Sequence, residues 1–144
     1  MFYISFTVEG KPLGKDRPRF FNGHAVTTAK TRNYEARVYA AACAAMGDFD
    51  GVEKIKERPC EVEIVAKYDI PKSYSKKKRL LCLEGHVTPN KPDADNIAKS
   101  ILDGMNGVCF KDDVQVHTLT VKKQYTEDCP CVKVTVWYEL GEEE

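Results

Sequence analysis

The sequence predicts an α+β fold, α/β in the broad sense: a mixed β-sheet of about four strands with about three helices packed against it. Some segments alternate apolar and polar residues, which is typical of half-buried strands. Others place apolar residues at helical spacing. The chain has 144 residues, 42% of them hydrophobic and 31% charged, so residues 1–144 are expected to form a single domain.

Four segments are expected to form the strands. Residues 2–8 alternate large apolar side chains with polar ones, and residues 60–68 repeat this pattern until Pro71 ends it. Residues 114–126 and 131–140 also alternate, with a hairpin-like connection between them.

Three segments are expected to be helices. Residues 34–46 are rich in alanine, and residues 73–83 form a short basic stretch. Residues 93–105 have an amphipathic pattern that Asn-Gly ends. Residues 15–30 and 48–58 are expected to be connections.

Composition excludes several classes of protein. No apolar run approaches the ~18 residues of a membrane span, and the N-terminus lacks the pattern of a secretion signal. Six cysteines without a CxxC pair predict reduced thiols in a cytoplasmic protein. No phosphate-binding glycine loop occurs, so no nucleotide cofactor is expected.

Charge is segregated, although the net charge is +0. Basic residues gather in residues 11–37 and 67–79, whereas acids gather in residues 93–113 and at the C-terminus. Such segregation allows a polyanion to bind a neutral chain, although a solvated basic surface would give the same pattern.

The stretch NKPDADNIAKS at residues 90–100 raises the main question about function. On a helical wheel Asp95 and Lys99 share the solvent-facing side, and Asp93 lies at the first turn. An N-cap aspartate with an ordinary i,i+4 ion pair explains part of this pattern. Two acids exceed what one cap requires, so a metal site is the second interpretation.

A second acidic pair, Asp112 and Asp113, stands where a strand is expected to begin. Alternate strand residues face opposite sides, so one of the two is expected to face the helix start. Carboxylates about 4 Å apart repel by roughly 4 kcal/mol at an effective dielectric near 20, which a divalent cation would offset. Oxygen ligands suit Mg²⁺, or Mn²⁺ as a substitute.

The combined motif resembles the RusA family of Holliday junction resolvases. The resemblance rests on GKPLGKDRPRF near the N-terminus, on KPDADNIAKSILDGMNG, and on DDVQV, and it spans residues 2–138. Only Met105 departs from the pattern, where leucine is usual, and this is a mild change in the core.

The resemblance implies a Mg²⁺-dependent homodimeric endonuclease that nicks four-way junction DNA symmetrically in recombination and repair. A metal-activated water would leave 5′-phosphate and 3′-hydroxyl ends. The family's metal ligands correspond to Asp93, Asp95 and Asp113, with Asp112 the less certain member of its pair, and its catalytic lysine corresponds to Lys99. A phage or prophage origin is also implied.

Seven basic side chains are candidates for phosphate contacts with DNA: Lys15, Arg17, Arg19, Lys76, Lys77, Lys78 and Arg79. The reaction itself favours a dimer, because two cuts in a two-fold junction need two sites. The surface that would pair the protomers cannot be read from the sequence, and Phe2, Tyr3 and Trp137 are expected in the core. Alternative functions are a nuclease for other branched DNA, a non-catalytic phage DNA-binding protein, and a metal-stabilised fold without catalysis.

Overall fold

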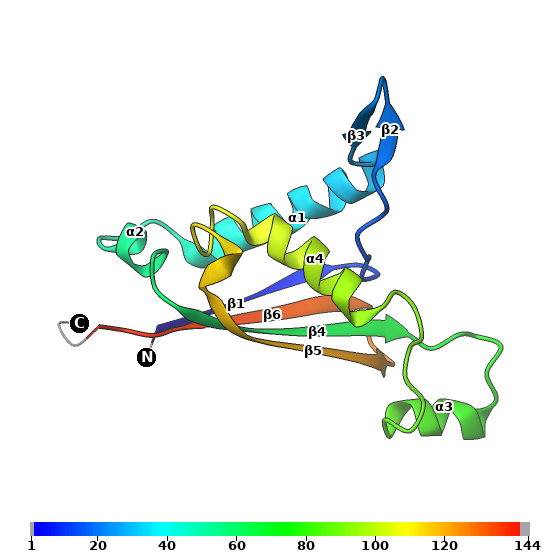
Figure 1. Ribbon diagram of the computed structural model, residues 1–144. Coiled ribbons are helices and arrows are strands. Elements are labelled where there is room, and N and C mark those ends of the chain that lie inside the picture. The colour runs from blue at the N-terminus through cyan, green and yellow to red at the C-terminus, as the bar shows by residue number, and fades with distance from the viewer. Residues whose placement is uncertain (1, 142–144) are drawn as a thin grey trace.

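Four strands form one mixed sheet in the order β1-β6-β4-β5 (Figure 1). A computed structural model describes residues 2–141. β1 and β6 pair antiparallel, β6 and β4 pair antiparallel, and β4 and β5 pair parallel.

The elements are β1 (Phe2–Glu9), β2 (Arg19–Phe21), β3 (His24–Val26), α1 (Ala29–Met46), α2 (Val52–Ile55), β4 (Cys60–Asp69), α3 (Lys76–Leu83), α4 (Ala94–Met105), the 3₁₀ turn η1 (Asp113–Gln115), β5 (Val116–Thr126) and β6 (Cys131–Tyr138).

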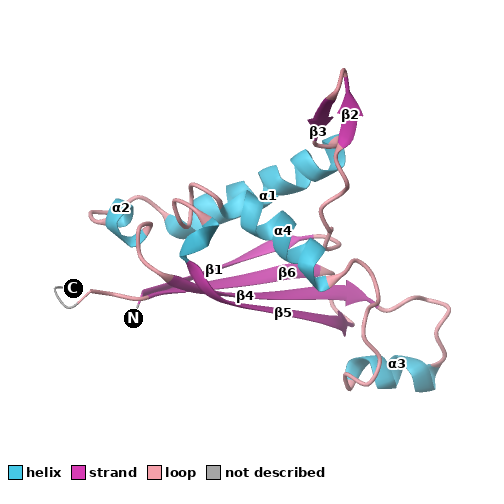
Figure 2. Cartoon of the chain, viewed as in Figure 1, coloured by secondary structure: helices cyan, strands magenta, loops and turns pink. Residues whose placement is uncertain are grey.

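Helices α1 and α4 cover one face of this sheet, while α2 and α3 lie near its two ends (Figure 2). The predicted α+β fold with a mixed sheet is therefore confirmed. Alternate residues of β4 and β6 point toward the helices, and every second side chain of β4 from Cys60 to Tyr68 is buried. The core forms between this apolar face and the apolar sides of α1 and α4.

Several boundaries differ from the sequence prediction. Helix α1 begins at Ala29, five residues early, because Thr28 caps it through a bond from the Thr31 N–H. The expected connection at residues 48–58 contains the short helix α2. Tyr3, expected in the core, is 62% exposed, because it points away from the helix-covered face.

The expected loop at residues 15–30 contains a β-hairpin. β2 and β3 are joined by Asn22-Gly23, whose φ angles are +51° and +78°. Positive φ at both central residues is the type I′ turn that Asn-Gly favours, so the dipeptide was an available signal. It is easily passed over because each strand has only three residues.

Within residues 2–141 no helix is long and apolar enough to cross a membrane. All six cysteines are free thiols, as predicted.

Gly104 allows α1 and α4 to cross at close range. A Cβ atom added there would lie 2.6 Å from Val38 Cβ and 3.1 Å from the Glu35 carbonyl oxygen. Val38 is fully buried, and its Cβ is fixed to the α1 backbone. The position of α4 on the sheet therefore depends on the absence of a side chain at Gly104.

We expect Gly104→Ala to lower the free energy of unfolding by about 1–3 kcal/mol, because overpacking outweighs alanine's better helix propensity. Urea denaturation followed by fluorescence of Trp137 measures this. Adding Val38→Gly removes the Cβ atom that the new methyl group would meet, so the double variant should lose less than the sum of the two single losses. A Gly104→Ala protein as stable as the wild type would contradict the close crossing.

Candidate active site

One face of α4 carries a row of charged side chains. Asp95, Lys99 and Asp103 are spaced four residues apart, so each lies about one turn above the previous one. Ile97 and Ile101 on the other side are fully buried, which turns the row outward. Asp95 and Lys99 are exposed, as the helical wheel predicted, whereas Asp103 is half-buried.

Asp93 occupies the N-cap position of α4, but its side chain makes no capping hydrogen bond. Its backbone is extended, and its carbonyl accepts the first helical bond from the Ile97 N–H at 3.1 Å. A capping carboxylate would instead accept a bond from one of the first N–H groups of the helix. The capping interpretation therefore fails for Asp93, and its exposed carboxylate remains available to another partner.

The basic segment that follows β1 lies directly against α4. The Ser100 hydroxyl donates to the Leu13 carbonyl at 2.8 Å, and the Lys15 N–H donates to the Asn96 carbonyl at 3.1 Å. A Cβ atom on Gly14 would lie 2.7 Å from Pro92 Cβ, so only glycine allows this approach. These hydrogen bonds and this close packing fix residues 13–15 beside the acidic helix start.

Lys15, predicted to contact DNA, is paired within the protein. Its ammonium group contacts the Asp103 carboxylate and lies 3.4 Å from Glu35 Oε1. These two carboxylates, chiefly Asp103, raise the pKa of Lys15 above its ordinary value. The ion pair anchors the basic segment to both α1 and α4, and its carboxylates offset the lysine's charge.

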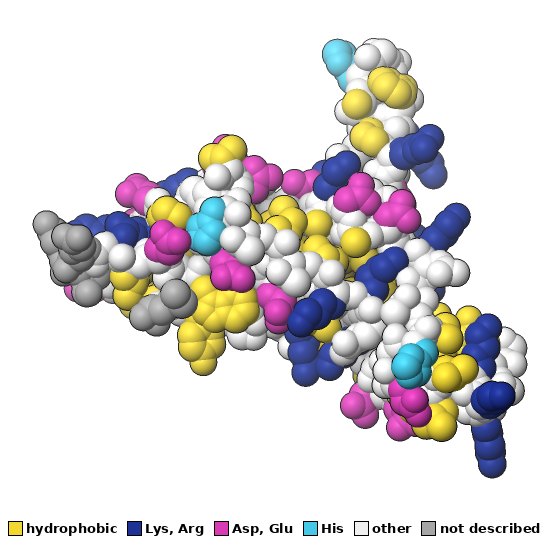
Figure 3. Space-filling model, turned by 60° about the horizontal axis from the view of Figure 1, so that its bottom comes forward, with side chains coloured by type: hydrophobic (Ala, Val, Ile, Leu, Met, Phe, Trp, Pro, Cys, Tyr) yellow, Lys and Arg dark blue, Asp and Glu magenta, His cyan; other side chains and the backbone are white. Residues whose placement is uncertain are grey.

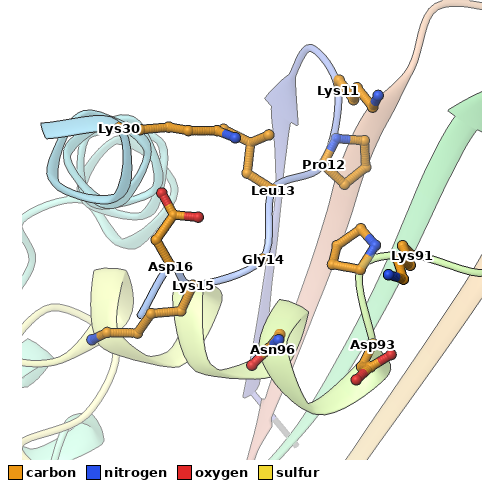
Figure 4. A pocket seen from close by; sticks show the side chains of 11 residues that line it. Lys11, Pro12, Leu13, Gly14, Lys15, Asp16, Lys30, Lys91, Asp93 and Asn96 are labelled. Carbon is orange, nitrogen blue, oxygen red and sulfur yellow. The ribbon is translucent and has the colours of Figure 1, made fainter. Parts of the chain in front are cut away.

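Two hollows open along this basic segment. One, of about 560 Å³, borders Asp93 and is lined by four lysines: Lys11, Lys15, Lys30 and Lys91 (Figure 4). The other, of about 610 Å³, borders Lys99 and Asp103 and includes Arg17. Carboxylates that could bind a metal ion therefore lie next to lysine and arginine side chains that could bind a phosphate.

Asp112 and Asp113 do not lie in a strand. The prediction that they project to opposite faces of a pleat is wrong, because they form the capped turn η1 before β5. Asp112 Oδ1 accepts from the Val114 N–H at 3.2 Å, and the Gln115 side chain accepts from the Asp112 N–H at 3.1 Å. A hydrogen bond with the Asp112 carboxyl raises the pKa of Asp113 above its ordinary value, and slight desolvation and the nearby charges of Asp112 and Asp103 raise it further.

The family described as "Endodeoxyribonuclease RusA" matches residues 9–137, almost the whole chain. The chain belongs to the RusA endodeoxyribonuclease family. It is also 36% identical over 140 residues to a Bacillus subtilis (strain 168) protein named "Uncharacterized protein YqaN", covering 92% of this chain and 94% of that protein.

The RusA carboxylates predicted to bind metal form two pairs rather than one cluster. Asp93 and Asp95 stand at the start of α4, whereas Asp113 and Asp112 lie within electrostatic reach of Asp103 at its end. Eight residues of helix separate Asp95 from Asp103, which is about 12 Å. Accordingly, within residues 2–141 no three His, Cys, Asp or Glu side chains are grouped closely enough to hold one metal ion.

Each carboxylate pair still fits a hard divalent cation. Mg²⁺ is commonly bound by one or two carboxylates together with substrate phosphates and waters, rather than by a cage of protein ligands. Asp93 is not engaged in capping, and Asp95 is exposed on its helix. Of the second pair, Asp112 is engaged as a cap, which leaves Asp113 as the more available ligand.

The basic run on α3 lies apart from these acids in the RusA fold (Figure 1). Ser75 caps the helix, and Lys76, Lys77 and Lys78 are exposed. Lys78 Nζ stands 3.9 Å from the centroid of the Tyr74 ring, and Arg79 is half-buried, donating to the Pro71 carbonyl at 3.4 Å. Figure 3 shows Lys and Arg side chains over this end of the molecule.

Several residues at the site were not selected from the sequence. Lys91, Asn96 and Asp103 belong to the family motif, which was a usable signal for all three. Glu35 and Lys30 come from other segments and reach the site only through folding. No local pattern marks these two.

Proposed function

We propose that this protein is a Mg²⁺-dependent endodeoxyribonuclease that resolves four-way DNA junctions by paired, symmetric nicks. The observation that carries the proposal is the uncapped Asp93 beside the exposed Asp95, next to a hollow lined by four lysines. A helix start of this kind gives up a capping bond and leaves two carboxylates available. Phosphodiester chemistry needs such acids for a cation and nearby positive charge for the phosphate.

When bound, Mg²⁺ would lower the pKa of a coordinated water and offset charge on the phosphate oxygens. Asp93 and Asp95 would hold one ion at the start of α4, and Asp113, supported by Asp112, would hold a second, with Mn²⁺ as the expected substitute. Lys99, one turn after Asp95, would contact the scissile phosphate or the attacking water. The products would be 5′-phosphate and 3′-hydroxyl ends, which can be ligated.

The substrate's symmetry supports a homodimer. A four-way junction has two-fold symmetry, and two opposed cuts require two sites related in the same way. We propose that the active species is a dimer that acts on branched DNA in the cytoplasm.

A cleavage panel tests this function. Synthetic four-way junction, flap, fork and plain duplex DNA are incubated with the protein in Mg²⁺, in Mn²⁺ and in chelator. We expect metal-dependent paired cuts in the junction and little cutting of the duplex. Preference for flaps or forks would assign a different branched substrate, and cutting of none in any metal would leave a non-catalytic DNA-binding protein.

The basic segment gives a second test. Each phosphate neutralised by a protein cation adds about −0.9 to the slope of log affinity against log salt. Arg17→Met should therefore make the slope shallower by about that amount. Lys15→Met should change it much less, because Asp103 and Glu35 already offset this charge. Fluorescence anisotropy across a salt series in chelator gives both slopes, and equal changes would place Lys15 among the DNA contacts.

A further inference from the structure

The β2–β3 hairpin forms an arm that stands away from the sheet and the helices that cover it (Figures 1 and 3). Every residue of both strands is exposed, and none belongs to the hydrophobic core. Phe20 is 79% exposed and Phe21 is 69% exposed, so two consecutive residues both present large apolar side chains to solvent. The arm contributes no core packing that would explain these residues.

The arm presents aromatic surface on both of its sides. Successive residues of a strand point to opposite faces, so Phe20 and Phe21 project in opposite directions. Residues 17–26 include Arg17 and Arg19 and contain no acidic residue. An aromatic and purely basic surface matches the chemistry of a nucleic acid better than that of an apolar protein groove.

The base of the arm is fixed to the body near the candidate active site. The Asp16 N–H donates to the Thr31 hydroxyl at 3.1 Å, and the Thr28 hydroxyl donates to Asp16 Oδ2 at 3.0 Å. Thr28 also caps α1, so both ends of the hairpin meet at the start of that helix. Residues 13–15, which dock on α4, lead directly into the arm. The base of the arm is therefore held at a fixed place relative to the carboxylates of α4.

We propose that this arm binds unpaired or unstacked DNA bases at the branch point, with Phe20 and Phe21 stacking on them while Arg17 and Arg19 contact the flanking phosphates. Bases of an intact duplex are already stacked on one another and offer their faces to no side chain, whereas bases at a branch are accessible. Stacking on aromatic side chains accepts every base, because each has a π face. The inference rests on the proposed action on branched DNA and deepens it.

The test uses junction DNA with 2-aminopurine at the branch point, because the fluorescence of this base reports its stacking. Wild type and Phe20→Ala/Phe21→Ala proteins are titrated in chelator, and a gel confirms that the DNA stays intact. We expect the wild type to change the fluorescence and the double variant to leave it unchanged. Junction affinity should fall by about tenfold or more, from stacking worth about 1–3 kcal/mol per base, while duplex affinity stays the same.

Two controls separate stacking from other losses. Tyr39→Ala removes an aromatic that is 52% exposed on α1 and should change neither reading. The salt slope of the double variant should match that of the wild type, because phenylalanine neutralises no phosphate. A changed slope would mean that the arginines had moved with the arm and would overturn the assignment to stacking.

Other outcomes count against the arm specifically. An unchanged 2-aminopurine signal, or an equal loss of affinity for duplex and junction, would overturn the inference. Sedimentation that shows the wild type as a dimer and the double variant as a monomer would assign the arm to contacts between protomers instead. A wild type that neither prefers nor cuts junction DNA would defeat the proposed function itself, whatever the variant does.

Discussion

Asp95→Asn should leave four-way junction DNA bound but uncut. Asparagine keeps the size of the side chain and removes the charge that would hold the cation. Metal ions supply several kcal/mol of transition-state stabilisation, so we expect cleavage to fall by about a thousandfold or more. Single-turnover cleavage in Mg²⁺ measures the loss, and titration calorimetry with Mg²⁺ or Mn²⁺ should show weaker metal binding.

The matched control for this variant is Asp48→Asn, which neutralises an exposed aspartate in the connection after α1. It should cut at the wild-type rate. Junction affinity in chelator should be preserved in both variants, because neither carboxylate contacts phosphate without a cation. Cleavage by Asp95→Asn at a near wild-type rate would remove Asp95 from the metal site.

Asp113→Asn should also abolish cleavage, whereas Asp112→Asn should retain most of it. The difference follows from η1, where Asp112 caps the turn and Asp113 does not. Asparagine caps as well as aspartate, so the turn should survive in Asp112→Asn. Equal losses in both variants would show that the acids act as a pair, and a loss confined to Asp112→Asn would reverse the assignment.

The same variants have a pH signature. In the wild type the Asp112 carboxyl raises the pKa of Asp113, so Asp113 takes up a proton at a higher pH than an isolated aspartate would. A metal must displace that proton, and binding therefore weakens as pH falls through this pKa. In Asp112→Asn the pKa of Asp113 should fall, which extends metal binding to lower pH. Carboxyl ¹³C NMR titration of the metal-free protein checks the direction.

The parts of the site that lie on one helix were predictable from the sequence. Helical spacing places Asp95 and Lys99 on one side and Ile97 and Ile101 on the other, whatever surrounds the helix. The buried side of β4 was equally readable, because its alternation runs without interruption. Local periodicity determines both results.

The parts that depend on pairing between distant segments were not predictable. The hairpin-like connection expected between the last two strands is wrong, because β6 lies between β1 and β4 and does not pair with β5. Strand order is set by tertiary packing, which no local pattern reports. Lys15 was a candidate for phosphate contacts with DNA, but docking of residues 13–15 on α4 brings it to Asp103, 88 positions away. Asp112 and Asp113 looked like the start of a strand, and the capping bonds of η1 decided otherwise.

The missing capping hydrogen bond at Asp93 sets the stability of α4 against the proposed function of this side chain. A side chain that bonds to the first N–H groups of α4 would strengthen the helix, by about 0.5–2 kcal/mol for a typical cap. It would also engage a carboxylate that we propose as a metal ligand. Selection for heat resistance alone would therefore favour a capped helix start and oppose the proposed metal site at this position.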